Sequence, residues 1–491
     1  MVLSRPSAVA AVSPRSMLLP LALAQLIASY ACTNMNVAVT AIAHDLGTTV
    51  QGVQTVITLF TLTMAALMIP GSKLSDIWGR RVCFRLGLAV YGIGALIAAL
   101  SPGIGVMVVG YSLLEGVGSA LMIPPIYILV TVYTTDTATR AKGLAVISAA
   151  AGVGSAVGPL IGGLVTSAIS WRASFLLQAL VVAGIIVLSR RIRDLPFEGE
   201  RPQFDPLGAV LMAAGLCFIV VGVLQSGVYG WFQSGKDFTV AGRTLIHEGG
   251  ISPVWLFVAL GLIILAAYAW HAAIEERSGR SPLISLRLFR NRTSNLGLVT
   301  QNVQWLTLQG SFFVISVYLQ TVKEHSAIET GLLLTPATIG ILLSSALAGR
   351  LARRRQQRTL VRGGFVTTIL GIALLLVFGG AGFGNFAALL ALLVVGLGVG
   401  VMLTASANVV QSAFSEKDQG EISGLSRSVS NLGSSLGTAI VGSVLVIAAS
   451  DHTYALALIV MEVFAVIGLA AALLLPSAAR AREPAPRPEM A

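Results

Sequence analysis

Charged residues divide the chain into long uncharged segments, and this pattern restricts the fold more than any other feature. The segments without Asp, Glu, Lys or Arg are 16–44, 46–72, 143–171, 173–189, 206–235, 249–274, 293–322, 330–349, 428–450 and 463–479. A helix needs roughly 20 apolar residues to cross a bilayer. Charged residues make up 11% of the chain, against about a quarter in soluble domains. The pattern predicts an all-α polytopic membrane protein.

Two longer segments each divide into a pair of helices. Residues 86–135 contain a single charged residue, Glu115, and Ser-Pro-Gly at 101–103 breaks the run near its middle. Residues 363–415 are broken by glycines and an asparagine between 379 and 385. Ten single spans and two pairs predict 14 transmembrane helices, so both termini lie on the same side. The last helix is expected to start near Tyr454.

Lys and Arg concentrate in alternate loops, which predicts that both termini are cytoplasmic. Of the 32 Lys and Arg residues, four fall on the opposite side: Arg172, Lys236, Arg243 and Lys323. Short positively charged loops stay in the cytoplasm, so we expect a multi-pass protein of the plasma or inner cell membrane. The net charge of +11 then reflects topology and not nucleic-acid binding.

The spans predict an order of segments along the chain. These are a cytoplasmic segment 1–16, a six-helix bundle 17–190, a cytoplasmic linker 191–206, two inserted helices 207–273, a second linker 274–293, a second six-helix bundle 294–476 and a cytoplasmic tail 477–491. No Cys or His cluster has metal-ligand spacing, and no glycine loop is followed by a Walker lysine. We therefore expect no metal, no cofactor and no enzyme activity.

The loop after the second expected helix, residues 72–81, reads Ser-Lys-Leu-Ser-Asp-Ile-Trp-Gly-Arg-Arg. A tight turn at Gly79, the carboxylate of Asp76 and the cations Arg80 and Arg81 can form ion pairs and helix-end contacts. The loop resembles the cytoplasmic signature loop of the major facilitator superfamily, G-x-L-a-D-r-x-G-r-k, with serine in place of the first glycine. The resemblance implies a gate at this loop.

Asp136 and Arg140, after the fourth expected helix, could pair with the signature loop as part of the same gate. This role is implied by the resemblance.

The fifth expected helix carries Gly-Ser-Ala-Val-Gly-Pro-Leu-Ile-Gly-Gly at 154–163. This sequence resembles the antiporter motif of the superfamily, g-x-x-x-G-P-x-x-G-G, at every specified position. Small residues four apart allow helices to approach closely in lipid, and a proline bends the helix. The motif residues, expected to form the interface between bundles, are Gly154, Gly158, Pro159, Gly162 and Gly163. A weaker second copy at 433–442 indicates an internal repeat.

Together, the span count, the antiporter motif, the Phe-Asp-Pro-Leu-Gly segment at 204–208 and the Trp-Arg pair at 171–172 resemble the 14-spanning drug:proton antiporter branch of the superfamily. The resemblance covers roughly residues 17–475. It implies two bundles that rock around a central cavity, and export of small amphipathic or hydrophobic molecules against proton entry. Small molecules, protons and membrane lipids are the expected partners.

Two positions depart from the pattern of this branch. Its acidic residue in the first helix is Ala31 here, and its arginine in the fourth helix is Ser112. Losing both charges together is coherent, because an unpaired charge within the bundle would cost several kcal/mol. An uncoupled facilitator, or a lipid or metabolite exporter of the same fold, is therefore the alternative to proton-coupled export.

Glu115 is the leading candidate for proton coupling, because an ionisable group near the centre of a spanning helix is a functional candidate. The alternative is a neutral Glu115 that only hydrogen-bonds a neighbour. Glu462, in the last helix, is a second candidate that could instead lie near an interface. Arg427 is expected to snorkel toward the cytoplasmic surface.

Two helices are unusually polar for lipid-buried segments, and they are the first members of the two six-helix halves. Both are expected to line a central cavity, although hydrogen bonding between helices is an equal alternative. The cavity candidates are Gln25, Tyr30, Thr33, Asn34, Asn36, Gln301, Gln304, Trp305 and Gln309. Gln301, Trp305 and Gln309 are spaced to share one helical face.

Overall fold

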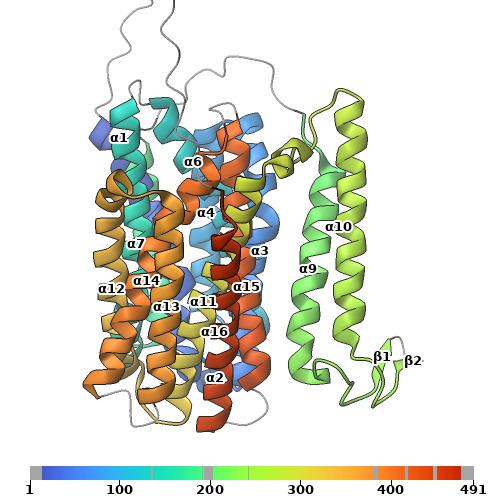
Figure 1. Cartoon of the computed structure of the whole chain (residues 1–491), viewed down its shortest axis with the longest axis vertical. Coiled ribbons are helices and arrows are strands. Elements are labelled where there is room, and N and C mark those ends of the chain that lie inside the picture. Colours follow the sequence, from blue (N-terminus) through green and yellow to red (C-terminus); the bar gives the residue numbers. More distant parts are fainter. Residues whose placement is uncertain are drawn as a thin grey trace, which may run out of the picture.

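Long helices that run side by side form nearly the whole molecule (Figure 1). This computed structural model describes residues 14–133, 137–190, 192, 203–240, 243–379, 385–414, 418–445 and 450–476. The elements of the first part are α1 (Pro14–Asn34), η1 (Met35–Val37), α2 (Val39–Asp45), α3 (Val50–Trp78), α4 (Arg80–Ala99), α5 (Ile104–Met107), η2 (Val108–Glu115), α6 (Gly116–Tyr133), α7 (Thr137–Ala168) and α8 (Trp171–Ser189).

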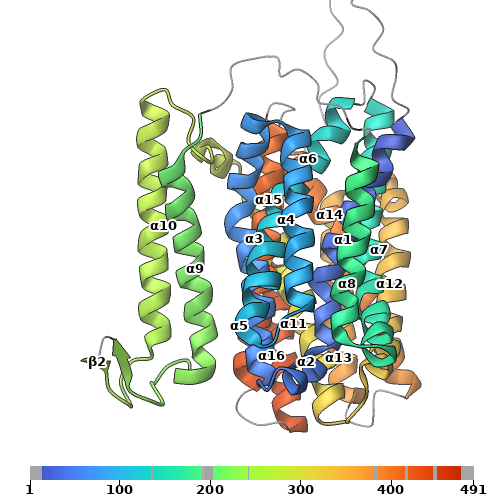
Figure 2. The same cartoon turned by 180° about the vertical axis from the view of Figure 1, so that it is seen from behind.

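The second part adds an antiparallel hairpin and eight long helices. Its elements are α9 (Pro206–Tyr229), β1 (Phe238–Val240), β2 (Arg243–Ile246), α10 (Pro253–Arg277), η3 (Leu286–Arg290), α11 (Arg292–Thr321), α12 (Ala327–Arg354), α13 (Gln357–Phe378), α14 (Phe386–Gln411), α15 (Gln419–Leu445) and α16 (Asp451–Leu473). Helix α1 begins and α16 ends at one end of the bundle, which we call the terminal end (Figures 1 and 2). The opposite end is the far end.

Twelve helices among the described residues are long and apolar enough to cross a bilayer, which makes the chain a multi-pass membrane protein. Helices α11 and α15 contain 30 and 27 residues and run alongside the others, but they are more polar. Most of α11 is buried within the protein, so its polar side chains need not face lipid. Composition thus supports twelve of the fourteen expected spans, and the length and position of α11 and α15 are consistent with the other two.

The first and fourth expected helices are less regular than the sequence suggests. In the first, a 3₁₀ turn (η1) separates α1 from the short helix α2. In the fourth, the π-helical segment η2 leads directly into α6, and Glu115 is the last residue of η2. Short π-helical segments inside helices occur frequently at functional sites.

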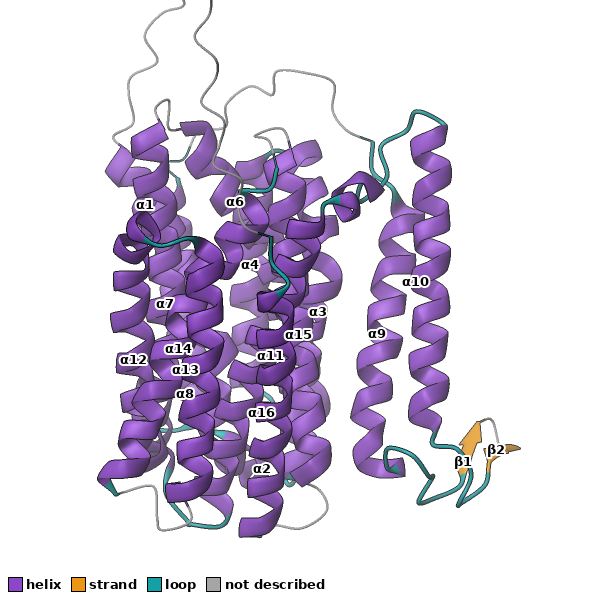
Figure 3. Ribbon diagram, viewed as in Figure 1, coloured by secondary structure: helices purple, strands orange, loops and turns teal. Residues whose placement is uncertain are grey.

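Helices α9 and α10 stand to one side of the other helices (Figures 1 and 2). Helix α9 packs on α3 and α15, and Leu216 and Val220 share an apolar cluster with Ile69. The Phe-Asp-Pro-Leu-Gly segment caps α9, since Asp205 Oδ1 accepts from the Gly208 amide at 2.8 Å. Between α9 and α10, the far end carries the hairpin β1–β2, which the sequence did not indicate (Figure 3).

The boundaries of the expected segments shift by a few residues. Helix α10 ends at Arg277, past the expected limit at 273, and the second linker also contains η3. Residues 193–202 of the first linker, and nearly all of the expected terminal segments 1–16 and 477–491, lie outside the described residues.

Candidate proton and substrate site

The two six-helix halves meet along two pairs of helices, α7 with α12 and α3 with α15. In the first pair, Thr338 Oγ1 donates to the Ala156 carbonyl at 2.8 Å. In the second, Ser435 Oγ donates to the Thr58 carbonyl at 3.0 Å. Each pair contains one helix that carries a copy of the glycine motif. The motif helices therefore connect the halves.

The antiporter motif lies between α1 and α12. A methyl group added at Gly154, Gly158 or Gly162 would overlap atoms of α1. One added at Gly163 would overlap the Ala327 carbonyl at the start of α12. The Pro159 carbonyl faces α12, where a Cβ at Gly331 would lie 2.6 Å from its oxygen.

The second copy of the motif has the equivalent contacts in the other half. Methyl groups at Gly433 and Gly437 would overlap the backbone of α11, as those at Gly154 and Gly158 overlap α1. A methyl group at Gly442 would overlap the side chain of Gln54 on α3. The repeat in the sequence thus corresponds to a repeat in packing.

A third connection between the halves joins the first helices of each, α1 and α11, toward the far end. Gln309 Nε2 donates to the Cys32 carbonyl at 2.7 Å. Next along the pair, Gln320 Nε2 donates to the Asn36 carbonyl at 3.2 Å, and the Thr40 hydroxyl donates to Gln320 Oε1 at 2.7 Å. This conformation therefore holds α1, η1 and α2 against α11 on the far side of the bundle centre.

Glu115 is buried inside the first half, with no exposed surface. Both carboxyl oxygens lack a hydrogen-bond partner among the described residues. Tyr91 on α4 lies close enough to interact with the carboxyl, but its hydroxyl donates to Gln178 Oε1 at 2.6 Å. Tyr111 on η2 and Cys32 on α1 are the other ionisable neighbours. The carboxyl thus faces titratable groups from three elements and no described cation within ion-pair distance.

Neutral contacts occupy the two positions where the drug:proton branch has charges. The Ala31 carbonyl accepts from the Tyr111 hydroxyl at 3.0 Å. The Ser112 hydroxyl donates to the Val56 carbonyl at 2.7 Å and is fully buried. The chain therefore stabilises these positions by hydrogen bonds alone.

Glu462 has different surroundings from Glu115. It lies on α16 and is partly exposed, and next to it Val463 is 53% exposed on the outside of the bundle. No described residue forms a hydrogen bond or an ion pair with it. Its position does not bring it together with Glu115.

In the signature loop, Asp76 near the end of α3 pairs with Arg80 at the start of α4, at 3.3 Å between oxygen and nitrogen. Gly79 separates α3 from α4 with a φ of 98°, in the region that favours glycine. Arg81 is partly buried beside this pair. Asp136 lies outside the described residues, and so does the side chain of Arg140.

The polar residues of α11 divide between two roles. Gln301 Oε1 accepts from Ser426 at 2.8 Å, and Gln304 pairs with Ser406 at 2.6 Å, so both are bonded within their own half. Trp305 is partly buried against the core. Gln309 crosses to α1. Gln301 and Gln309 therefore bind different partners, Gln301 within its own half and Gln309 in the other half.

The polar side chains of α1 and η1 lie within the first half. The Tyr30 hydroxyl pairs with Ser174 on α8 at 2.7 Å. Thr33 and Asn34 lie against the glycines of α7. Asn36 is buried, and neither atom of its side-chain amide has a partner among the described residues.

The structure also shows a contact that sequence reasoning missed. Arg427 on α15 does not extend to the terminal surface; its guanidinium lies 4.9 Å from the centre of the Tyr127 ring on α6 and donates to the Tyr127 hydroxyl. That hydroxyl donates to Gln25 Oε1 on α1 at 3.3 Å. Arg427 thus reaches from the second half to the first. The sequence signal was a basic residue eight positions inside a polar helix.

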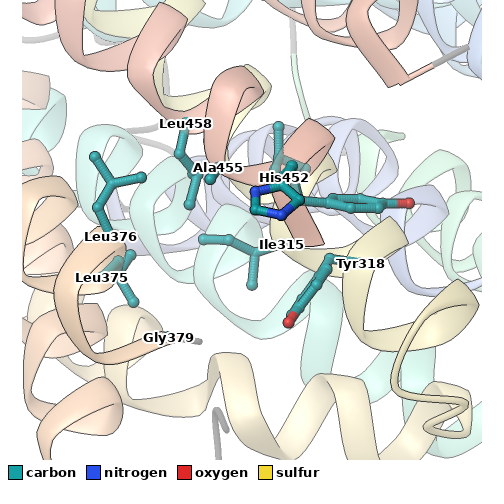
Figure 4. Close-up of a pocket in the computed structure, with 10 residues that line it drawn as sticks. Ile315, Tyr318, Leu375, Leu376, Gly379, His452, Ala455 and Leu458 are labelled. Atoms are coloured by element: carbon teal, nitrogen blue, oxygen red, sulfur yellow. The ribbon is translucent and has the colours of Figure 1, made fainter. Parts of the chain in front are cut away.

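A separate pocket of about 220 Å³ opens at the far end, between α11, α13 and α16 (Figure 4). Apolar side chains such as Ile315, Leu375 and Leu458 line it, with Tyr318, His452 and Tyr454 as its polar members. None of the residues singled out from the sequence contributes to this pocket.

Repeated helical halves that pack through glycine motifs are typical of secondary transporters. A family model described as Major Facilitator Superfamily matches residues 21–438 and, a second time, 298–490. The chain belongs to the major facilitator superfamily.

Two bacterial relatives are similar over most of the chain. One, from Streptomyces coelicolor, is described as a probable actinorhodin transporter; it is 27% identical over 84% of this chain and 69% of its own. Another, the puromycin resistance protein pur8 of Streptomyces alboniger, is 28% identical over 86% of this chain and 80% of its own. A solved peptide transporter, POT in complex with sulfate, matches with a TM-score of 0.64 at 17% identity over 94% of each chain, which shows the fold alone.

Proposed function

We propose that this protein is a secondary active exporter that moves small amphipathic or hydrophobic compounds out of the cell by alternating access. Relatives described as an antibiotic transporter and an antibiotic resistance protein support export. We further propose that both termini are cytoplasmic and that the protein lies in the cell membrane. The boundaries 17–190, 207–273 and 294–476 then mark two rocking bundles and two inserted helices.

The proposed driving force is proton entry, with Glu115 as the residue that carries the proton. The observation behind this proposal is a fully buried carboxyl without a hydrogen-bond partner among the described residues. A charged carboxylate needs donors or water around it, whereas the neutral acid can be buried more easily. Gain and loss of the proton would therefore be linked to conformations that differ in water access to Glu115.

The remaining site residues have proposed roles in the movement of the halves. Pro159 and the motif glycines would form the surface on which α7 turns against α1 and α12. Asp76, Gly79, Arg80 and Arg81 would stabilise one gate state at the terminal end, and the resemblance adds Asp136 and Arg140 to this gate. Gln25, Tyr127 and Gln309 lie where the halves face each other, and they are the best-supported substrate contacts.

Transport in proteoliposomes with an imposed pH gradient tests the coupling. Two fluorescent substrates of opposite charge, ethidium and 11-(dansylamino)undecanoic acid, would be compared in wild type and Glu115→Gln. We expect gradient-driven transport of at least one of the two compounds in wild type, and in Glu115→Gln retained binding of that compound with transport that no longer responds to the gradient.

Glu462→Gln is the matched control, since it removes a carboxyl from the outside of the bundle. If wild type carries substrate equally fast with and without the gradient, the uncoupled facilitator is the correct reading. The lack of coupling would then be explained by the uncharged residues Ala31 and Ser112 at the two positions where the drug:proton branch has charges.

A further inference from the structure

A basic side chain lies between the two halves, and no acidic residue in the described part of the chain pairs with it. Arg427 is eight residues into α15, which places it about 12 Å along the helix from the terminal end. It keeps part of its surface accessible, as does Tyr127. No described carboxylate lies within ion-pair distance of its guanidinium.

The guanidinium is held in a defined position with most of its hydrogen-bonding capacity unused. It stacks on Tyr127 and donates to the Tyr127 hydroxyl, and no other hydrogen bond to a described residue involves it. An arginine offers five N–H donors in a planar fork that matches a carboxylate. The hydroxyl of Tyr127 donates in turn to Gln25. These two hydrogen bonds in series fix Arg427 against the first half.

Glu115 is too distant to neutralise Arg427 directly. Twelve residues separate it from Tyr127 along α6, which corresponds to about 18 Å. Cys32 on α1 is close enough to both Glu115 and Arg427 for each charge to act on its thiol. An embedded charge without a partner is costly, and such residues usually mark a pathway for a substrate or an ion.

We propose that Arg427 binds the acidic group of the transported compound, so that the protein selects amphipathic molecules that carry a carboxylate or a similar anion. Tyr127 positions the guanidinium by stacking and by accepting its hydrogen bond. This inference rests on the proposed export function and names the substrate class. The aromatic ring of Tyr127 offers a surface for the apolar body of the same compound.

A matched pair of ligands tests the assignment on the purified full-length protein. The pair is 11-(dansylamino)undecanoic acid and its primary amide, which differ only in the charge of the head group. We expect wild type to bind the acid at least ten times more tightly than the amide, as measured by dansyl fluorescence. Arg427→Gln should bind both with equal affinity, and Arg427→Lys should keep part of the preference because the charge remains.

Arg280→Gln is the control for overall charge, since Arg280 is an exposed residue between α10 and η3. It should keep the full preference for the acid. Equal affinity of wild type for acid and amide, or a preference that survives in Arg427→Gln, would overturn the assignment.

An anionic lipid head group has the same chemistry as an acidic substrate. Phosphatidylglycerol added to the purified protein in detergent micelles distinguishes a lipid site from a substrate site. A lipid that occupies Arg427 would displace the dansyl acid from wild type and leave its binding to Arg427→Gln unchanged. We expect no displacement. If proteoliposomes export acid and amide at equal rates, the proposal of an exporter is kept and the proposed selectivity for anions is wrong. If neither compound is exported, the proposed function itself is wrong.

Discussion

The close approach of α7 and α12 can be tested with a pair of glycine substitutions at the same interface. In Gly331→Ala, the new Cβ would lie 2.6 Å from the Pro159 carbonyl oxygen, about 0.8 Å short of ordinary contact at 3.4 Å. In Gly152→Ala, the nearest atom across the interface is Ser345 Oγ at 4.0 Å. Both substitutions gain the same helix propensity, about 1 kcal/mol, so comparing them isolates the cost of overpacking.

Overpacking a close contact costs about 1–3 kcal/mol. We therefore expect Gly331→Ala to be less stable than Gly152→Ala by that amount, because the halves must move apart against the backbone of Pro159. Thermal unfolding of both purified variants, followed by tryptophan fluorescence, measures the difference. Equal unfolding temperatures for the two variants, or a Gly331→Ala protein more stable than wild type, would refute the reasoning.

Three further substitutions test other contacts. Hydrogen bonds from Arg172 and Trp171 lower the pKa of Asp45 below its usual value. The stabilisation is thus present above that usual value and is lost as pH falls through the lowered one, so the difference in unfolding temperature between wild type and Asp45→Asn should be full at pH 6 and shrink as the pH is lowered below the usual value. Asp205→Ala removes the cap of α9 together with the contacts of this carboxylate to His271 and the Leu283 amide; loss of the cap alone should cost about 0.5–2 kcal/mol, seen as a lower unfolding temperature, whereas an unchanged value would show that these contacts are dispensable. Glu462→Gln should export at the wild-type rate over the same pH gradient, and a loss of gradient response would move the coupling site to α16.

The helical architecture could be predicted from the sequence because lipid imposes a simple requirement. A spanning helix must satisfy its backbone internally and present apolar side chains to lipid, so uncharged runs reveal it. The same requirement does not apply to α11 and α15, which pack among other helices. Their polar residues, such as Gln301 and Ser426, bond to each other, and apolarity alone therefore finds twelve spans.

The glycine motifs could be located because close helix contact needs small residues at fixed spacing. The sequence could not show which helix each glycine faces. Gly163 turns to α12 and Gly158 to α1, and this depends on the three-dimensional order of the helices.

Arg427 shows where sequence reasoning ends. From position alone, a basic residue near a helix end is expected to reach for the surface. Its actual partner, Tyr127, lies 300 residues away in the chain, and no local pattern connects them. The π-helical segment that ends at Glu115 was likewise not visible, since its residues Val108–Glu115 belong to an apolar run that predicts one continuous helix.

The central claim is that Glu115 exchanges a proton as substrate is exported, and proton release on substrate binding tests it most directly. Purified protein in weakly buffered detergent solution would receive saturating 11-(dansylamino)undecanoic amide, a neutral ligand that carries no proton of its own, with a pH-sensitive dye as reporter. The account predicts a pH-dependent release of protons from wild type and none from Glu115→Gln at equal ligand occupancy. Equal release from both proteins would contradict it.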